Sequence, residues 1–144
     1  MKDPQVEKEL RLLTLLAESW KRLHDFVTYA LDKAKPVISV DQERHFTELR
    51  GILLQETEHV FAECDLTEQL AGKAMNVLHR ATSVRGVRDL SNEETRRLEL
   101  DWNGVFTKIG LVQGQLKARR KELRSRSGFV ESLAQIFGRK KAFR

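Results

Sequence analysis

A glutamate and a histidine three residues apart, Glu56 and His59, form the spacing in this chain best suited to binding a metal ion. Residues three apart share one face of a helix, and ferritin-like bundles hold two iron ions with two Glu-x-x-His pairs and two further glutamates. The sequence has no second pair of this kind, and no histidine follows His79. We therefore predict no metal site and no cofactor, and a metal-binding helical-bundle enzyme stands as an alternative interpretation.

Motifs that supply a nucleophile or bind phosphate through a glycine-rich loop are absent from the sequence. It contains no G-x-S-x-G, G-x-x-x-x-G-K-[ST], G-x-G-x-x-G or C-x-x-C motif. Cys64 is the single cysteine, and on the apolar side of a helix a free cysteine behaves as a small buried hydrophobe. We therefore predict no catalytic residues and a protein that is not an enzyme.

The strongest chemical signal is the positive charge at the C-terminal end. The chain carries a net charge of +5, yet residues 117–144 hold ten Lys and Arg against two acidic residues. The remaining residues hold 16 basic and 19 acidic side chains. This asymmetry predicts an anionic partner surface. The predicted basic binding residues are Lys117, Arg119, Arg120, Lys121, Arg124, Arg126, Arg139, Lys140, Lys141 and Arg144.

Four large apolar residues follow Gly128 at helical spacing and form the predicted apolar binding face: Phe129, Leu133, Ile136 and Phe137. An apolar stripe beside a basic cluster is typical of a short helix that lies in the plane of an anionic membrane. The same face could instead dock in the groove of a protein partner. Each basic residue near an anionic leaflet contributes about 1 kcal/mol to binding.

Two further interpretations of this end compete with attachment. The segment after Gly128 could fold back on the rest of the chain as a fifth short helix. The basic stretch could also bind nucleic-acid phosphates, although it contains no interleaved aromatic residues that would stack on bases. Phosphorylation of Ser125 or Ser127, which lie between arginines, would weaken any anionic attachment.

The segments that position the candidate binding residues show helical periodicity along most of the chain. Asp3 before Pro4 is a helix start, and Pro36 predicts the end of that helix, about 45 to 48 Å away. Ser39 with Gln42 forms a capping box for a helix over residues 40–63.

Two more capping boxes open the remaining helices. Asp65 with Glu68 predicts a helix that continues to about Gly86, and Ser91 with Glu94 opens the last long helix. Glycines 110 and 114, four residues apart, indicate close packing of another helix. We expect Gly128 to end the last helix. Its apolar seam keeps heptad spacing through Leu98, Trp102, Val105, Ile109, Val112, Leu116 and Leu123, and runs through the Asn103-Gly104 pair.

These patterns predict an all-α fold, an up-and-down antiparallel bundle of about four helices with long first and last helices and a short C-terminal amphipathic segment. We divide the chain into a bundle domain, residues 1–128, and a basic amphipathic tail, residues 129–144. No apolar run approaches the roughly 20 residues of a transmembrane helix, and the start of the chain does not resemble a secretion signal.

The functional prediction is a non-enzymatic helical adaptor or scaffold that binds a protein partner. It attaches through its C-terminus to an anionic membrane surface or to a partner groove. A nucleic-acid-binding protein that uses the basic end of the last helix is the alternative. A cytoplasmic protein at the membrane periphery, with self-association left open, completes the prediction.

Overall fold

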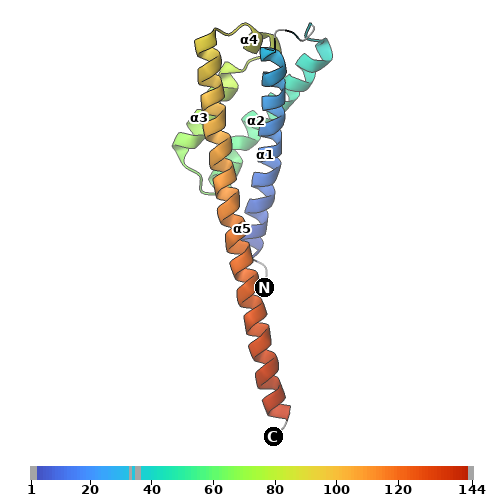
Figure 1. Ribbon diagram of the computed structural model, residues 1–144, viewed down its shortest axis with the longest axis vertical. Helices are drawn as coiled ribbons and strands as arrows, with labels where there is room; N and C mark the ends of the chain where they lie inside the picture. The colour runs from blue at the N-terminus through green and yellow to red at the C-terminus, as the bar shows by residue number, and fades with distance from the viewer. Residues whose placement is uncertain (1–2, 33, 35–36, 143–144) are drawn as a thin grey trace.

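The computed structural model describes residues 3–32, 34 and 37–142, without the side chains of residues 127 and 137–142. The described residues form five helices and no strand. These helices are α1 (Pro4–Leu31), α2 (Val40–Glu63), α3 (Glu68–Arg80), α4 (Val84–Arg88) and α5 (Asn92–Ala142). The chain is therefore all-helical, as predicted. Figure 1 shows α5 running beside α1 in the opposite direction and continuing well past the N-terminus.

Helix α1 begins as predicted and ends earlier than predicted. The Asp3 side chain accepts a hydrogen bond from the backbone N–H of Gln5 at 2.9 Å, and Pro4 occupies the first turn. The helix ends at Leu31, whereas Pro36 lies outside the described residues. Arg88 of α4 donates to the backbone carbonyls of Ala30 and Tyr29 at 2.8 and 3.3 Å. An arginine distant in sequence therefore binds two of the last carbonyls of α1, which no local sequence signal could reveal.

Helix α2 confirms its capping box. Ser39 accepts from the Gln42 backbone N–H at 3.1 Å, and the Gln42 side chain accepts from the Ser39 N–H at 2.8 Å. The predicted start of the next helix at Asp65 is wrong, because Asp65 adopts a positive φ of 55° in the turn that closes α2. Thr67 is the residue that caps α3.

The predicted single helix from residue 66 to about Gly86 is two helices. α3 ends at Arg80, where Arg50 of α2 donates to the carbonyl of Leu78 at 2.7 Å. Ser83 then caps α4 by accepting from the Gly86 N–H at 2.8 Å. A Cβ on Gly86 would lie 2.8 Å from the Thr82 hydroxyl oxygen, so this glycine serves a close approach inside α4 instead of a helix end.

Helix α5 starts where the sequence predicts, since Ser91 accepts from the Glu94 backbone N–H at 3.1 Å. It runs unbroken through Asn103-Gly104, as predicted, and through Gly128, which was expected to stop it. One glycine costs a helix up to about 1 kcal/mol, which strong helix formers on both sides can offset. Over 51 residues α5 is about 77 Å long.

The core gathers around α1, which packs against α5, α2 and α4, while α3 packs against α5 and α2. The largest fully buried side chains are Trp20, Phe46, Phe61, Leu13, Leu23, Leu53, Leu78, Leu98 and Ile109. Trp102 of α5 donates its indole N–H to the carbonyl of Trp20 at 3.1 Å and so fixes the register of α5 on α1. This register decides which part of α5 is packed and which part projects.

Candidate functional site

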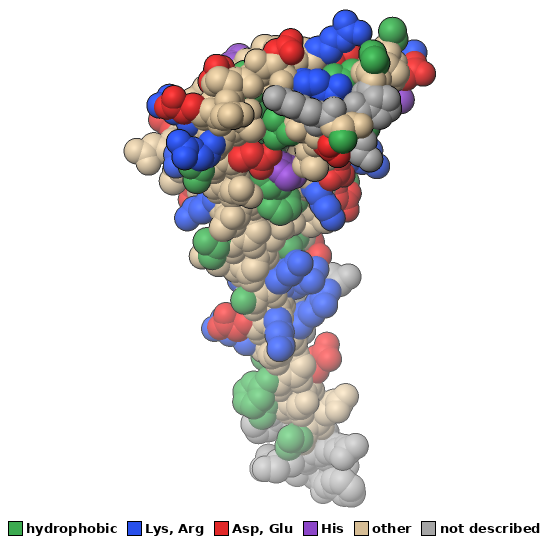
Figure 2. Space-filling view, turned by 45° about the horizontal axis from the view of Figure 1, so that its top comes forward, with side chains coloured by type: hydrophobic (Ala, Val, Ile, Leu, Met, Phe, Trp, Pro, Cys, Tyr) green, Lys and Arg blue, Asp and Glu red, His purple; other side chains and the backbone are tan. Residues whose placement is uncertain are grey.

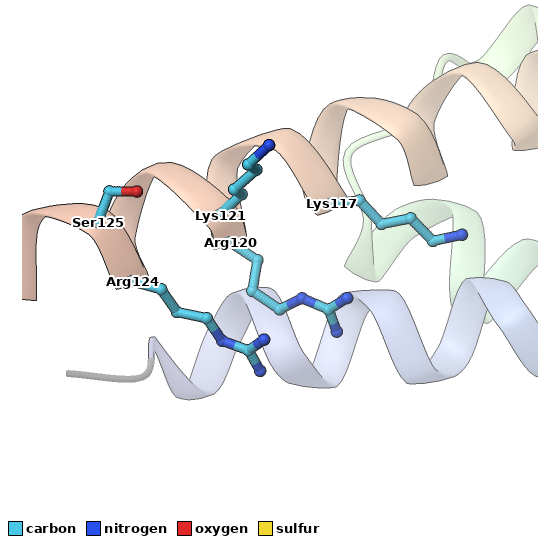
Figure 3. Close-up of a pocket in the computed structure, with 5 residues that line it drawn as sticks. All are labelled: Lys117, Arg120, Lys121, Arg124 and Ser125. Atoms are coloured by element: carbon cyan, nitrogen blue, oxygen red, sulfur yellow. The ribbon is translucent and has the colours of Figure 1, made fainter. Parts of the chain in front are cut away.

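The first candidate surface is the neck, which we define as residues 117–125 of α5, where this helix passes the beginning of α1. Four cationic side chains and one hydroxyl line a shallow hollow there: Lys117, Arg120, Lys121, Arg124 and Ser125. Arg120 and Arg124 point toward α1, whereas Lys121 points away from it (Figure 3). Figure 2 shows Lys and Arg side chains gathered where the molecule narrows. The neck is therefore a positively charged surface at the α1–α5 seam.

Acidic groups of α1 compensate only part of this charge. Glu7 lies 3.8 Å from both Arg120 and Arg124, and Asp3 lies 4.0 Å from Arg119. Among the described residues, neither Lys117 nor Lys121 makes an ion pair. The neck therefore keeps a surplus of positive charge.

The second candidate surface lies on residues 126–142 of α5, a range that we call the tail from here on in place of the predicted 129–144. Its apolar side chains are open to solvent, with Phe129 65% and Ile136 52% exposed. Val130 and Leu133 are also exposed and lie on the same side of the helix. The alternative in which this segment folds back onto the bundle as a fifth short helix does not occur, because the segment continues α5 and projects beyond α1 (Figure 1). An exposed apolar stripe on a projecting helix is a candidate interaction surface.

The two surfaces face different ways. Residues of an α-helix follow one another about 100° apart around its axis. From this spacing, the four neck cations centre on roughly the opposite side of α5 from Phe129, Val130, Leu133 and Ile136. The four cations of the hollow and the apolar stripe, which the sequence suggested as parts of one attachment element, therefore form two surfaces. Arg119 and Arg126 lie on the side of the stripe by the same spacing.

The predicted binding residues divide between these surfaces. Lys117, Arg119, Arg120, Lys121 and Arg124 lie in the neck. Arg126 lies in the tail and pairs with Glu122 at 2.8 Å. The side chains of Phe137, Arg139, Lys140 and Lys141, and the whole of Arg144, lie outside the described residues. Val130 was not predicted, although it stands seven residues after Leu123 on the same seam.

A hydroxyl, an imidazole and a carboxylate meet between α1 and α5. The Nε2 of His24 lies 2.9 Å from Glu99, and its Nδ1 lies 3.4 Å from the Thr28 hydroxyl. The His24 ring stacks on Trp102 with centroids 3.9 Å apart, so the cluster serves to hold α5 on α1.

The Glu56 and His59 pair does not gather further ligands. Both residues are exposed on α2. Within the part of the chain that the structure describes, no three His, Cys, Asp or Glu side chains are placed to hold a metal ion.

Glycines 110 and 114 face open space, so the close helix approach expected there does not occur within the described chain.

Cys64 is buried at the C-terminal end of α2, where its thiol lies 3.8 Å from the carbonyl oxygen of Glu9. Burial, together with the nearby carboxylates of Glu9 and Glu63, raises the pKa of the thiol from 9.0 to about 11. The thiol is therefore protonated at neutral pH and is a poor nucleophile.

Comparisons with protein-family models, with curated proteins and with solved structures found no match to this chain. No described helix carries an apolar stretch long enough to cross a membrane.

Proposed function

We propose that this protein is a non-enzymatic adaptor whose tail lies in the plane of an anionic membrane and holds the packed helices at that surface. In this proposal the packed helices form an up-and-down bundle that carries a protein partner. The observation that carries it is the exposed apolar stripe of the tail, on a helix that projects past the rest of the chain. The cytoplasmic leaflet, which is rich in anionic lipids, is the proposed location.

Burial of apolar surface supplies the attraction. Phe129 and Val130 are 65% and 61% exposed, and Ile136 is 52% exposed. Full burial of a side chain of this size contributes about 1.5–3 kcal/mol. Insertion of the stripe into the boundary between headgroups and acyl chains would bury these side chains together, and no other element of the described chain covers them.

The cations at both ends of the stripe favour an anionic membrane over a protein groove as its partner. Arg126 lies near the beginning of the stripe, and the sequence places Arg139, Lys140 and Lys141 after its end. Lipid headgroups surround the ends of a helix that lies in the membrane plane, so cations at both ends would contact phosphates. A protein groove would have to offer acidic groups at both ends to match this pattern.

Flotation with vesicles of phosphatidylserine and phosphatidylcholine tests the proposal. We expect the wild-type chain to float and the variant Phe129→Gln/Ile136→Gln to remain at the bottom, because glutamine keeps the helix and removes the apolar surface. The matched control is Leu100→Gln/Leu111→Gln, whose leucines are 65% and 53% exposed on the same line of α5. This control should float like wild type.

Two results would contradict the proposal. Failure of the wild-type chain to float at low salt would show that the tail has no affinity for anionic lipid. Equal loss of flotation in both double variants would show that the tail stripe has no special role.

A further inference from the structure

We propose that the neck is a second binding site, separate from the tail, for a compact ligand that carries several clustered phosphate groups. Such phosphates could belong to a soluble polyphosphate or to a multiply phosphorylated lipid headgroup. The proposal concerns the neck alone and does not require the tail to bind a membrane.

The geometry of the neck matches a ligand of this size. Lys117, Arg120, Lys121 and Arg124 line one hollow and occupy two consecutive turns, about 10 Å along the helix axis. On the side of α1, Arg11 lines an adjoining hollow together with Lys117 and Arg120. Cations from two helices therefore border the same region of the α1–α5 seam.

The ion pairs in the neck leave its cations available. At 3.8 Å, the oxygens of Glu7 lie beyond hydrogen-bond distance from Arg120 and Arg124. A phosphate could therefore take these guanidinium groups at little cost. Arginine binds phosphate through two parallel N–H donors, and lysine adds a point charge. Ser125 in the same hollow supplies a hydroxyl donor.

The structure of α5 does not by itself require this cluster. Cations near the C-terminal end of a helix interact favourably with its dipole, but the neck lies far before Ala142, where α5 ends. Lys117 and Lys121, like Arg120 and Arg124, are four residues apart, and like charges at this spacing destabilise a helix. Binding of a polyanion would relieve this repulsion.

The neck and the tail stripe face roughly opposite sides of α5, so the two surfaces can bind different ligands at the same time. Because the neck cations and the tail stripe lie on roughly opposite sides of α5, a membrane in contact with the tail leaves the neck facing away from it. The neck should therefore bind a soluble polyphosphate whether or not the tail is attached.

Isothermal titration of the full chain with inorganic tripolyphosphate tests the site. We expect Lys117→Gln/Lys121→Gln to weaken binding by about tenfold or more, since each removes a charge-assisted contact. The matched control Arg96→Gln/Lys108→Gln removes the same charge from exposed positions of α5 outside the neck and should change affinity by less than about twofold. Glu7→Gln should strengthen binding by about threefold, because it removes the competing carboxylate.

Three results would overturn the proposal. The first is absence of tripolyphosphate binding at moderate salt. The second is equal weakening by the neck and control variants, which would indicate nonspecific attraction. The third is much tighter binding of single-stranded RNA, with a steep salt dependence and loss in the neck variant, which would make the neck a nucleic-acid interface.

The tail variant Phe129→Gln/Ile136→Gln distinguishes the two sources of phosphate. It should bind tripolyphosphate like wild type, whatever the outcome of the flotation experiment. Its recruitment to neutral vesicles that carry a bisphosphorylated lipid headgroup would identify a lipid source. Retained tripolyphosphate binding without recruitment would identify a soluble ligand, and both outcomes support the site.

Discussion

The first and second halves of α5 have similar sequence patterns and different surroundings. Between Leu98 and Leu116 the seam is buried on α1 and α3, and Val105 and Ile109 are fully buried. Beyond Leu123 the same spacing continues through Val130, which is 61% exposed. Apolar periodicity therefore indicates that a helix has a face to bury, but not whether the same chain supplies the partner.

The largest expected effect comes from replacing one isoleucine in each half of α5 by alanine. Ile109→Ala should lower the free energy of unfolding by about 2–5 kcal/mol, because it leaves a cavity in the core. Ile136→Ala should change it by no more than about 0.5 kcal/mol, since no other described element packs on the tail. Urea unfolding followed by circular dichroism measures both, and similar losses in the two variants would mean that the tail packs on the body in solution.

The second test uses the buried thiol of Cys64. Its pKa is about 11 in the folded chain and near 9.0 in an exposed thiol, so the folded state holds the proton more tightly. The stabilisation is complete below pH 9 and is lost as the pH rises from about 9 to about 11. Urea unfolding across this range should therefore show a decline that is smaller in Cys64→Ala.

The tail sharpens this second test. Phe129→Gln/Ile136→Gln should leave the decline with pH unchanged, because the tail and Cys64 belong to different parts of the molecule. A changed decline in that variant would indicate that the tail is coupled to the packed helices around Cys64.

The third test compares two glycines of α5. A Cβ at Gly114 or Gly128 would meet nothing within 4 Å, so both positions accept alanine. Gly114→Ala should raise the free energy of unfolding by up to about 1 kcal/mol. Gly128→Ala should raise the helical signal at elevated temperature without moving the main unfolding transition, and a shift of that transition would contradict an independent tail.

The smallest expected effect on stability lies at the boundary between the halves. Glu7→Gln removes the carboxylate that faces Arg120 and Arg124, a partly exposed interaction worth about 0–1 kcal/mol. We expect a loss of roughly 1 kcal/mol at most in urea unfolding. A loss above about 2 kcal/mol would show that these ion pairs hold α5 against the beginning of α1.

Local signals predicted the starts of α1, α2 and α5 but not those of α3 and α4, and side chains of other helices bind the ends of α1 and α3. The caps at Asp3, Ser39 and Ser91 need only their own neighbours, and all three are present. The end of α1 and the end of α3 involve Arg88 and Arg50, which come from other helices. Such pairings cannot be read from spacing along one segment.

The sequence composition predicted the residues of the candidate surfaces, and the geometry of α5 separates these residues into two surfaces. The sequence identified the cations and the apolar residues but treated them as one element. Their separation depends on the continuity of α5 through Gly128, where a helix stop was predicted. The cluster of His24, Glu99 and Trp102 left no sequence signal, because its members lie on helices that meet only in the folded chain.

Because α5 is unbroken, it fixes the rotational orientation of the tail relative to the packed helices. A flexible linker of the tail's length would span a similar distance, roughly 21–25 Å, with its end free to point in any direction. The helix instead transmits both tilt and rotation. A single residue inserted between neck and tail would turn the apolar stripe by about 100° and advance it by only about 1.5 Å. The number of residues between Arg124 and Phe129 thus sets the angle around the α5 axis between the packed helices and the apolar stripe.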